Sequence, residues 1–453
     1  MKNILSKAKF ILLAGIMVSC EGFLDPKPNQ SLVVPSTLTD VQNLLDNTTV
    51  FNTQGILPLL STDEFWATDD AYNGLSTLVE QGTYRWAEDP YQRGFTSDWS
   101  DPYAQIFYAN VALEVLGKIE EESGKSEKSQ ELMGSALFHR AYAYFNLLQQ
   151  FTSPYSKNGE NSDKQGIVIR ENADISTPSV RSGLLESYEI VQTDLIKSVE
   201  LLPLEASPKN RPCKSAALGV LARFYLNTFQ YDEAIEAAEA SLDFYQARLD
   251  FNTLNLDVSR PFGRFNDEII FYSVLGSVGF YRSPQVYVDS TIVQLFEEGD
   301  LRLPAYFTQS SNGNYNFTKY LTGLPFLFSG ISVGEMQLIA AEGYVRNGNV
   351  KEAGVLLNEL LSLRYQTGTW EGVDIINENE MLNRVLEERK KELFGRGMRW
   401  TDLRRLNQYP EFQKVLSREI NGEIFTLNPN SKFYVFPIPD DEIERSGISQ
   451  NPR

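Results

Sequence analysis

The sequence lacks most of the residues on which nucleophilic catalysis and metal sites depend. Its 453 residues include one histidine, His139, and two cysteines. A single histidine excludes metal motifs that need two of them, and it excludes most His-based triads. No glycine-rich loop of the kind that cradles phosphate occurs either. We therefore expect neither an enzyme nor a cofactor. We interpret His139, which lies within an apolar helical pattern, as a structural residue.

Positive charge is scarce as well. The chain carries 41 lysines and arginines against 60 aspartates and glutamates, which gives a net charge of −19. Nucleic acids and anionic membrane surfaces attract basic proteins, so neither is an expected partner. The same acidic balance disfavours polyanionic ligands.

Long hydrophobic runs are missing beyond the N-terminus. A membrane-spanning helix needs roughly 20 apolar residues, and no later segment reaches that length. The chain begins with a basic stretch, an apolar run over residues 10–18 and then Ser19-Cys20. This pattern predicts a lipoprotein signal peptide over residues 1–19 and a lipidated Cys20 as membrane anchor. The alternative is an ordinary signal peptide followed by a coincidental cysteine. The other cysteine, Cys213, is expected to be a small core residue.

Two distant segments share one helical spacing. In each, a small residue is followed three positions later by a tyrosine and, nine positions beyond that, by an alanine. The positions are Ala222, Tyr225 and Ala234 in the first segment and Ala341, Tyr344 and Ala353 in the second. This spacing is typical of tetratricopeptide helix pairs, in which small residues let two helices approach. Gly348 makes the turn in the second copy, and Phe229 replaces that glycine in the first.

Further amphipathic patterns predict a mainly α fold. We expect four helix pairs stacked into a tetratricopeptide-like right-handed superhelix within a single domain over residues 20–453. Long insertions of loops and short strands interrupt it, at about 50–95 and 250–330, and long loops in compact proteins usually carry function. The predicted helical scaffold covers about 100–150, 184–245, 333–365 and 378–407.

Several motifs, in this order, resemble the SusD/RagB family along nearly the whole chain. They are Cys20–Asp25, Trp99–Tyr103 with Ile106 and Asn110, Arg140–Leu148, Glu335–Glu342, Glu387–Phe394 with Arg399-Trp400 and Asp402-Leu403, and Tyr434–Pro439 with Glu442 and Gln450–Pro452. One departure is Gly395-Arg396-Gly397, where many members carry an acidic residue before the glycine.

The resemblance implies a function that composition and spacing do not supply. Members of this family are lipid-anchored on the outer face of the outer membrane of Bacteroidetes-type bacteria. They capture a nutrient and deliver it to a SusC-type TonB-dependent transporter. Most bind glycans, whereas the RagB branch handles peptides. The ligand is bound and not cleaved, so the resemblance implies a SusD-like nutrient-binding protein for carbohydrate uptake.

Two other functional classes remain open from sequence. A surface lipoprotein that cleaves glycans or peptides would need two carboxylates about 5–10 Å apart across a cleft. An adhesion or scaffold protein would use the repeat groove for peptides. Asp63-Glu64 and Asp69-Asp70 offer oxygen ligands for calcium, but no EF-hand spacing supports such a site, and we expect no metal. Arg399 and Asp402 lie three positions apart on a predicted helix, where they could pair, and we interpret them as residues that stabilise the fold and not as catalytic groups.

Ligand-contacting aromatic residues are expected in the insertions, because the helices are committed to packing. Sugar rings present apolar C–H faces that stack on tryptophan and tyrosine. The candidates are Trp66, Tyr72, Asn73 and Trp86 in the first insertion, and Tyr281, Tyr287 and Tyr315, with Asn312, Asn314 and Asn316 as hydroxyl partners, in the second.

Overall fold

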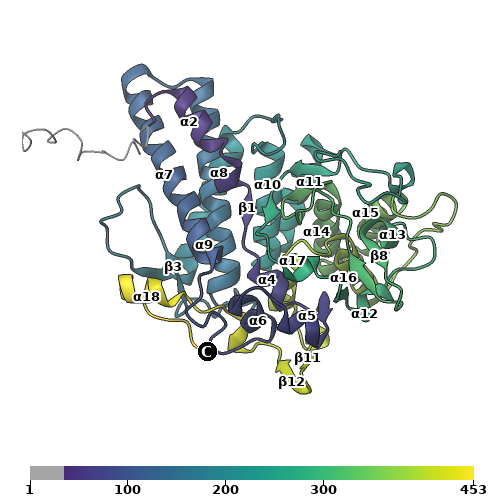
Figure 1. Cartoon of the computed structure of the whole chain (residues 1–453). Coiled ribbons are helices and arrows are strands. Elements are labelled where there is room, and N and C mark those ends of the chain that lie inside the picture. The colour runs from purple at the N-terminus through teal and green to yellow at the C-terminus, as the bar shows by residue number, and fades with distance from the viewer. Residues whose placement is uncertain (1–34) are drawn as a thin grey trace, which may run out of the picture. The chain divides into compact units, whose positions relative to one another are not determined.

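Helices are the predominant secondary structure in this computed structural model, which describes residues 35–453 (Figure 1). Residues 37–453 form one unit by their contacts. The predicted signal peptide over residues 1–19 and the lipidation site Cys20 lie outside the described residues. Within the described part of the chain, no helix is long and apolar enough to cross a membrane.

A row of packed helices forms the scaffold. Along the row, α7 packs on α8, α8 on α9, α9 on α10, α10 on α11, and α11 on α14. Helix α14 then packs on both α15 and α16, and Figure 1 shows the row from α7 to α14 side by side. The prediction of a mainly α, helical-repeat fold is confirmed. The helices are α7 (Ser97–Ser123), α8 (Glu127–Phe151), α9 (Leu184–Leu201), α10 (Lys214–Asn227), α11 (Tyr231–Phe244), α14 (Val333–Arg346), α15 (Val350–Leu361), α16 (Glu378–Glu392) and α17 (Met398–Leu406).

Capping side chains explain where several of these helices begin. The Thr96 hydroxyl accepts a hydrogen bond from the backbone N–H of Asp98 (3.3 Å) at the start of α7. Ser126 and Ser129 exchange two such bonds of 3.0 Å at the start of α8. Asn377 caps α16 in the same way. Each cap satisfies a backbone donor that has no partner within its helix.

The repeated small residues lie where paired helices touch. The four alanines are fully buried: Ala222, Ala234, Ala341 and Ala353. The turns between the paired helices also match, since Gly348 has a φ of +77° and Phe229 a φ of +61°. Phe229 thus adopts the left-handed conformation of the glycine that it replaces, which carries a steric cost for any residue with a Cβ.

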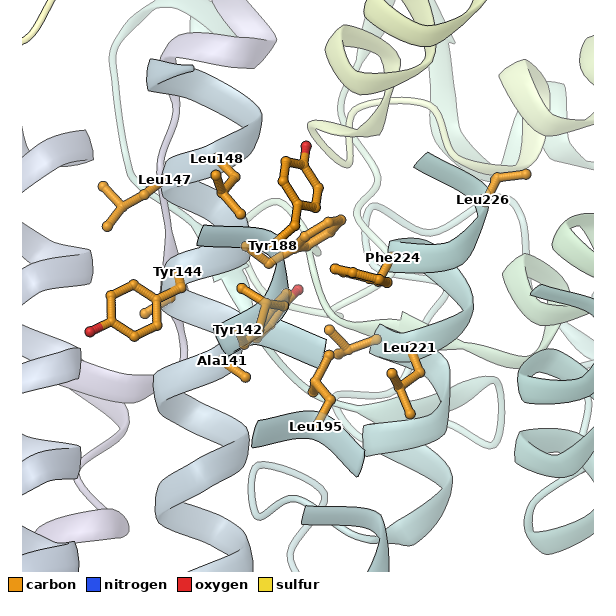
Figure 2. Packing of buried hydrophobic residues seen from close by; sticks show 14 of the residues in the cluster. Ala141, Tyr142, Tyr144, Leu147, Leu148, Tyr188, Leu195, Leu221, Phe224 and Leu226 are labelled. Atoms are coloured by element: carbon orange, nitrogen blue, oxygen red, sulfur yellow. The ribbon is translucent and has the colours of Figure 1, made fainter. Parts of the chain in front are cut away.

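The largest apolar core lies between α8, α9 and α10. Figure 2 shows Tyr142 of α8, Tyr188 of α9 and Phe224 of α10 packed in one cluster. The rings of Tyr188 and Phe224 lie 5.7 Å apart. Cys213 precedes α10, is buried and forms no disulfide among the described residues. The prediction that it is a core residue is confirmed.

The two long insertions pair with each other through short strands. Strand β1 pairs in parallel with β6, and β2 pairs antiparallel with β7, so that Trp66 stands opposite Tyr287. Helix α2 (Leu38–Leu45) precedes the first insertion, which holds α3 (Thr48–Phe51), β1 (Thr53–Gln54), α4 (Leu57–Ser61), β2 (Phe65–Ala67), α5 (Asp69–Asn73) and α6 (Leu78–Tyr84). The second holds β5 (Ile269–Phe271), β6 (Val274–Leu275), β7 (Val286–Val288), α12 (Ser290–Val293), α13 (Arg302–Tyr306), β8 (Phe307–Gln309), β9 (Tyr315–Phe317), β10 (Ile331–Ser332) and the 3₁₀ turns η1 (Phe251–Thr253) and η2 (Phe280–Arg282).

Smaller elements complete the fold. Two further antiparallel pairs join β3 (Gln165–Val168) to β4 (Arg181–Gly183) and β11 (Leu416–Ile420) to β12 (Glu423–Leu427). The remaining elements are η3 (Pro410–Phe412), η4 (Lys432–Tyr434) and α18 (Asp440–Ser446).

Buried ion pairs join the first insertion to the C-terminal helices. Arg399 of α17 donates to Asp63 at 2.7 and 2.9 Å. Arg399 and Asp402, which the helical spacing would allow to pair, form ion pairs with other residues. Asp402 instead accepts hydrogen bonds of 2.9 Å from Arg389 of α16 and from Arg405. In the structure Arg399 binds Asp63 of the first insertion, and Asp402 binds Arg389 of α16 and Arg405 of α17.

The second insertion is joined to the scaffold in the same manner. Arg302 is fully buried and contacts Asp300 at 2.7 Å and Glu388 of α16 at 2.6 Å. Arg364, also fully buried, follows α15 and contacts Glu268 of the second insertion at 3.1 Å and Glu392 of α16 at 2.8 Å. Removing one partner of such a pair leaves a buried charge uncompensated, so these contacts define how the insertion sits on the helices.

His139 is buried in α8 beside the ring of Phe51, with 4.4 Å between the ring centres. Its Nε2 has no hydrogen-bond partner among residues 35–453. Burial lowers the pKa of His139 to about 3. The side chain is therefore a neutral core residue whose polar atom is not satisfied.

Candidate ligand-binding site

A cavity of about 630 Å³ opens where the two insertions meet the β11–β12 hairpin. We call it the insertion cavity. The first insertion contributes residues between 62 and 69 together with Tyr84 and Trp86. The second contributes Asp289 and Thr291. The remaining wall is formed by residues 414–419, at the start of the hairpin.

An aromatic pair stands at this cavity. Trp66 of β2 is half-buried, lines the cavity and lies against Tyr287 of β7, with ring centres 4.9 Å apart and ring planes at 40°. Tyr287 is buried, and its hydroxyl accepts a hydrogen bond from Asn312 (3.0 Å). The pairing of β2 with β7 brings these two residues together from separate insertions. Trp66 is thus the more exposed residue of the pair. Tyr287 packs against it, and Asn312 holds Tyr287 by a hydrogen bond.

Trp86 forms a wall of the cavity from a buried position. Its Nε1 donates to the carbonyl of Ser61 (3.0 Å). The guanidinium of Arg418 lies 4.4 Å from the Trp86 ring and 3.7 Å from the Tyr84 ring. Arg418 also donates to the carbonyl of Leu60 (3.0 Å) and to the carbonyls of Tyr84 and Thr62. Burial lowers the pKa of Arg418 to about 10. The cation is fully engaged in holding this wall.

The other aromatic candidates lie in the cores of the insertions, away from the cavity lining. Tyr72 is buried against Tyr84, with ring centres 6.0 Å apart. Tyr281 is buried against Tyr320 at 6.1 Å. Tyr315 is half-buried on β9, a strand that lies beside β7.

Asn73 is exposed at the end of α5 and also lies outside the cavity lining. It exchanges hydrogen bonds of 2.9 and 3.0 Å with Asn421 in the turn of the β11–β12 hairpin. The structure therefore unites Trp66, Trp86 and, through its contact with Trp66, Tyr287. It does not bring Tyr72, Asn73 or Tyr281 to the same surface.

The acidic pair proposed for calcium is engaged by protein groups. Asp63 contacts Arg399 and Lys414, each at 2.7 Å. Burial alone would raise the pKa of Asp63, but the attraction of these two cations and their hydrogen bonds hold it well below its usual range. Burial raises the pKa of Glu64 to about 7, although the backbone N–H of Gly395 donates to it at 2.9 Å. Within residues 35–453, no group of three potential metal ligands occurs.

Comparison with known proteins places this geometry in context. A family model described as "Starch-binding associating with outer membrane" matches residues 22–226, and a second, described as "SusD family", matches residues 332–453.

The chain belongs to the SusD family.

Relatives of this SusD family protein agree over its length. It is 22% identical to SusD-like protein P2 of Formosa agariphila, across 98% of this chain and 99% of the relative. A SusD superfamily protein of Bacteroides vulgatus superposes with a TM-score of 0.73 at 21% identity, over 92% of this chain and 99% of the other. A SusD-like carbohydrate binding protein of the same species gives 0.66 at 18% identity, over 91% and 97%. These structures establish the shared fold.

Sequence reasoning missed the third wall of the cavity in this SusD family protein. The side chains of Lys414, Ser417 and Glu419 come from the β11–β12 hairpin, far along the chain from both insertions. There is little signal for this wall in the sequence. In the structure residues 416–420 alternate buried and exposed, but the central buried position is the charged Arg418, so apolar and polar residues do not alternate along the strand.

The carboxylates of the cavity are occupied in ways that do not favour acid catalysis. Asp63 is held ionised by its two cations. Asp69 accepts a hydrogen bond from the backbone N–H of Asn421 (2.7 Å), and Asp289 accepts one from the backbone N–H of Thr291 (2.9 Å) at the start of α12. A glycosidase acid must remain protonated until it reaches the leaving group, which requires a raised pKa. Glu64, whose pKa burial raises to about 7, is buried and does not line the cavity.

Proposed function

We propose that this chain binds an oligosaccharide in the insertion cavity at the cell surface and delivers it to a SusC-type TonB-dependent transporter of the outer membrane. The starch-binding, outer-membrane description of the matching family model supports oligosaccharide binding at the cell surface. So does the shared fold with a SusD-like carbohydrate binding protein. The resemblance to SusD/RagB proteins supports the transporter as partner and lipid on Cys20 as anchor.

The observation that carries the proposal is the Trp66–Tyr287 pair at the cavity. A half-exposed indole whose rear face is packed against a second ring has a fixed orientation, so little conformational entropy is lost when a sugar stacks on it. The cavity volume of about 630 Å³ lies within the usual range of ligand pockets, about 300–1,000 Å³. Sugar hydroxyls can bind to the hydroxyl groups of Thr68, Thr291 and Ser417 and to the carboxylates of the neighbouring acidic residues.

The test begins with a glycan array probed by the purified full-length protein in mild detergent. The strongest oligosaccharide is then titrated by calorimetry against the wild type and Trp66→Ala. Base–aromatic stacking contributes about 1–3 kcal/mol per ring, and on that scale the variant should bind about 5- to 150-fold more weakly. Chromatography of the glycan after incubation should show no shorter products.

The chain offers a matched control outside the cavity. Trp370 is also half-buried and packs on a tyrosine, Tyr365, with ring centres 4.7 Å apart and planes at 41°. Trp370→Ala should bind the glycan like the wild type. Unchanged binding by a folded Trp66→Ala variant would show that the ligand site lies elsewhere. Binding to a peptide library, with no binding on the glycan array, would indicate that the ligand is a peptide, as in the peptide-binding branch.

A further inference from the structure

We propose that the insertion cavity selects uncharged or basic glycans and rejects anionic ones, with Asp69, Asp289 and Glu419 as the residues that determine this selectivity. The inference rests on the proposed function, since it concerns the ligand class of the same cavity. It is carried by the balance of free charges along the cavity wall. Three carboxylates there lack a cation, whereas the cations are already bound to protein groups.

Each wall of the cavity contributes one of these carboxylates. Asp69 comes from the first insertion, Asp289 from the second and Glu419 from the hairpin. Asp69 and Glu419 are exposed, and Asp289 is half-buried. None of the three forms an ion pair within the described part of the chain. The bonds that Asp69 and Asp289 accept come from neutral donors, the backbone N–H groups of Asn421 and Thr291, and not from a cation.

The cations of the cavity are engaged elsewhere. Lys414 keeps 40% of its side chain exposed, but its Nζ lies 2.7 Å from Asp63. Arg418 is buried beneath the rings of Tyr84 and Trp86 and donates to backbone carbonyls. A uronic acid or sulfate entering the cavity would have to displace one of these contacts to find a counter-charge. It would meet the three carboxylates at the same time.

A neutral or basic glycan faces no such conflict. Its hydroxyl or ammonium groups donate hydrogen bonds, and bonds to an ionised acceptor are stronger than bonds between neutral groups. The ring faces remain free to stack on Trp66. The same carboxylates therefore favour one class of glycan while repelling the other, which is how a binding site achieves specificity through an unfavourable contact.

Ligand pairs that differ only in charge test the inference. One pair is an oligogalacturonide and its fully methyl-esterified form; the other is a chitosan hexamer and the neutral N-acetylated hexamer. We expect calorimetry to give at least about tenfold weaker binding for the free acid than for its ester, and binding of the chitosan hexamer at least as tight as that of its acetylated form. Raising the ionic strength from about 0.01 to 0.15 M shortens the screening length from about 30 to 8 Å, and should narrow the gap between acid and ester.

A charge-neutralised variant assigns the effect to these residues. The triple variant Asp69→Asn, Asp289→Asn and Glu419→Gln keeps an acceptor oxygen at each position and should reduce the acid-to-ester ratio of dissociation constants by about tenfold. The control changes net charge equally on α11, far from the cavity lining, and should leave the ratio unchanged. Its substitutions are Glu233→Gln, Glu236→Gln and Asp243→Asn, all at exposed positions.

Failure of the charge selectivity can be distinguished from failure of glycan binding. Equal or tighter binding of the free acid, sensitive to Trp66→Ala, would overturn the charge selectivity and leave glycan binding in the cavity intact. An unchanged ratio in the folded triple variant would likewise remove Asp69, Asp289 and Glu419 as its determinants. Absence of any glycan binding that Trp66→Ala weakens would overturn the proposed function, and the selectivity with it.

Discussion

Replacing Arg399 by methionine tests whether a buried ion pair holds the first insertion against the helical scaffold. The Asp63 and Arg399 side chains are only 9% and 8% exposed, and the substitution leaves Asp63 with Lys414 as its remaining ion-pair partner. Breaking a buried pair by removing one partner costs about 3–5 kcal/mol. Because Lys414 still compensates part of the charge, we expect Arg399→Met to lower the free energy of unfolding by about 2–4 kcal/mol.

The pH dependence sharpens this prediction. Burial acts to raise the pKa of Asp63, but Arg399 and Lys414 together lower it below the unfolded value of 3.8. A lowered pKa contributes stability above the unfolded pKa, and that stability is lost as the pH falls further. Loss of Arg399 weakens the lowering. The stability gap between wild type and variant should therefore be widest near neutral pH and narrow below about pH 4.

The assay is urea unfolding, monitored by far-ultraviolet circular dichroism at several pH values. The dependence of the unfolding free energy on urea concentration should be the same in both proteins, which checks two-state behaviour. Arg445→Met serves as the matched control. Its ion pair with Asp441 is 3.5 Å long between side chains that are 79% and 58% exposed. Exposed pairs contribute at most about 1 kcal/mol, so this control should unfold nearly like the wild type. Equal effects of the two substitutions, or a gap that does not narrow with acidity, would refute the reasoning.

Two further outcomes follow from the helical scaffold. Gly348→Ala should cost about 1–2 kcal/mol in unfolding free energy, since Gly348 has a φ of +77°, and an unchanged denaturation midpoint would contradict that turn. His139→Leu tests the buried imidazole, whose pKa burial lowers to about 3. Since the unfolded chain binds the proton near pH 6.5, the wild type should lose about 2 kcal/mol more stability than the variant between pH 6.5 and 5. Parallel stability curves for the two proteins would show that His139 titrates normally when folded.

The helical scaffold was predictable because its signals are local. Small residues and tyrosines at fixed spacing report which side of a helix is buried, and that spacing survives in any tertiary context. Ala222 and Ala353 lie fully buried, as the repeat required. Even the irregular copy obeyed the rule, since Phe229 takes the backbone conformation of the glycine that it replaces.

The site was only partly predictable, because its contacts join distant segments. Composition of the insertions pointed to Trp66, Trp86 and Tyr287, but nothing local indicates that β2 pairs with β7. Tyr72 and Tyr281 are as buried as Trp86 and Tyr287. What distinguishes them is their position, since Trp66 and Trp86 line the cavity and Tyr287 contacts Trp66. The pairing that helical spacing allows between Arg399 and Asp402 does not form, for a related reason. A spacing rule for helices cannot anticipate a carboxylate delivered from another part of the chain.

These misses share a physical cause that also explains how the site is built. The insertions have an apolar core of their own, but apolar contacts are non-directional and tolerate small shifts between packed surfaces. An ion pair such as Asp63–Arg399 tolerates far less, because any other placement leaves a buried charge without a partner. Asp63 lies three residues before Trp66, so two contacts position the indole: the ion pair of Asp63 with Arg399 of α17, and the pairing of β2 with β7. The position of Trp66 therefore depends on α17 and on the second insertion as well as on its own insertion.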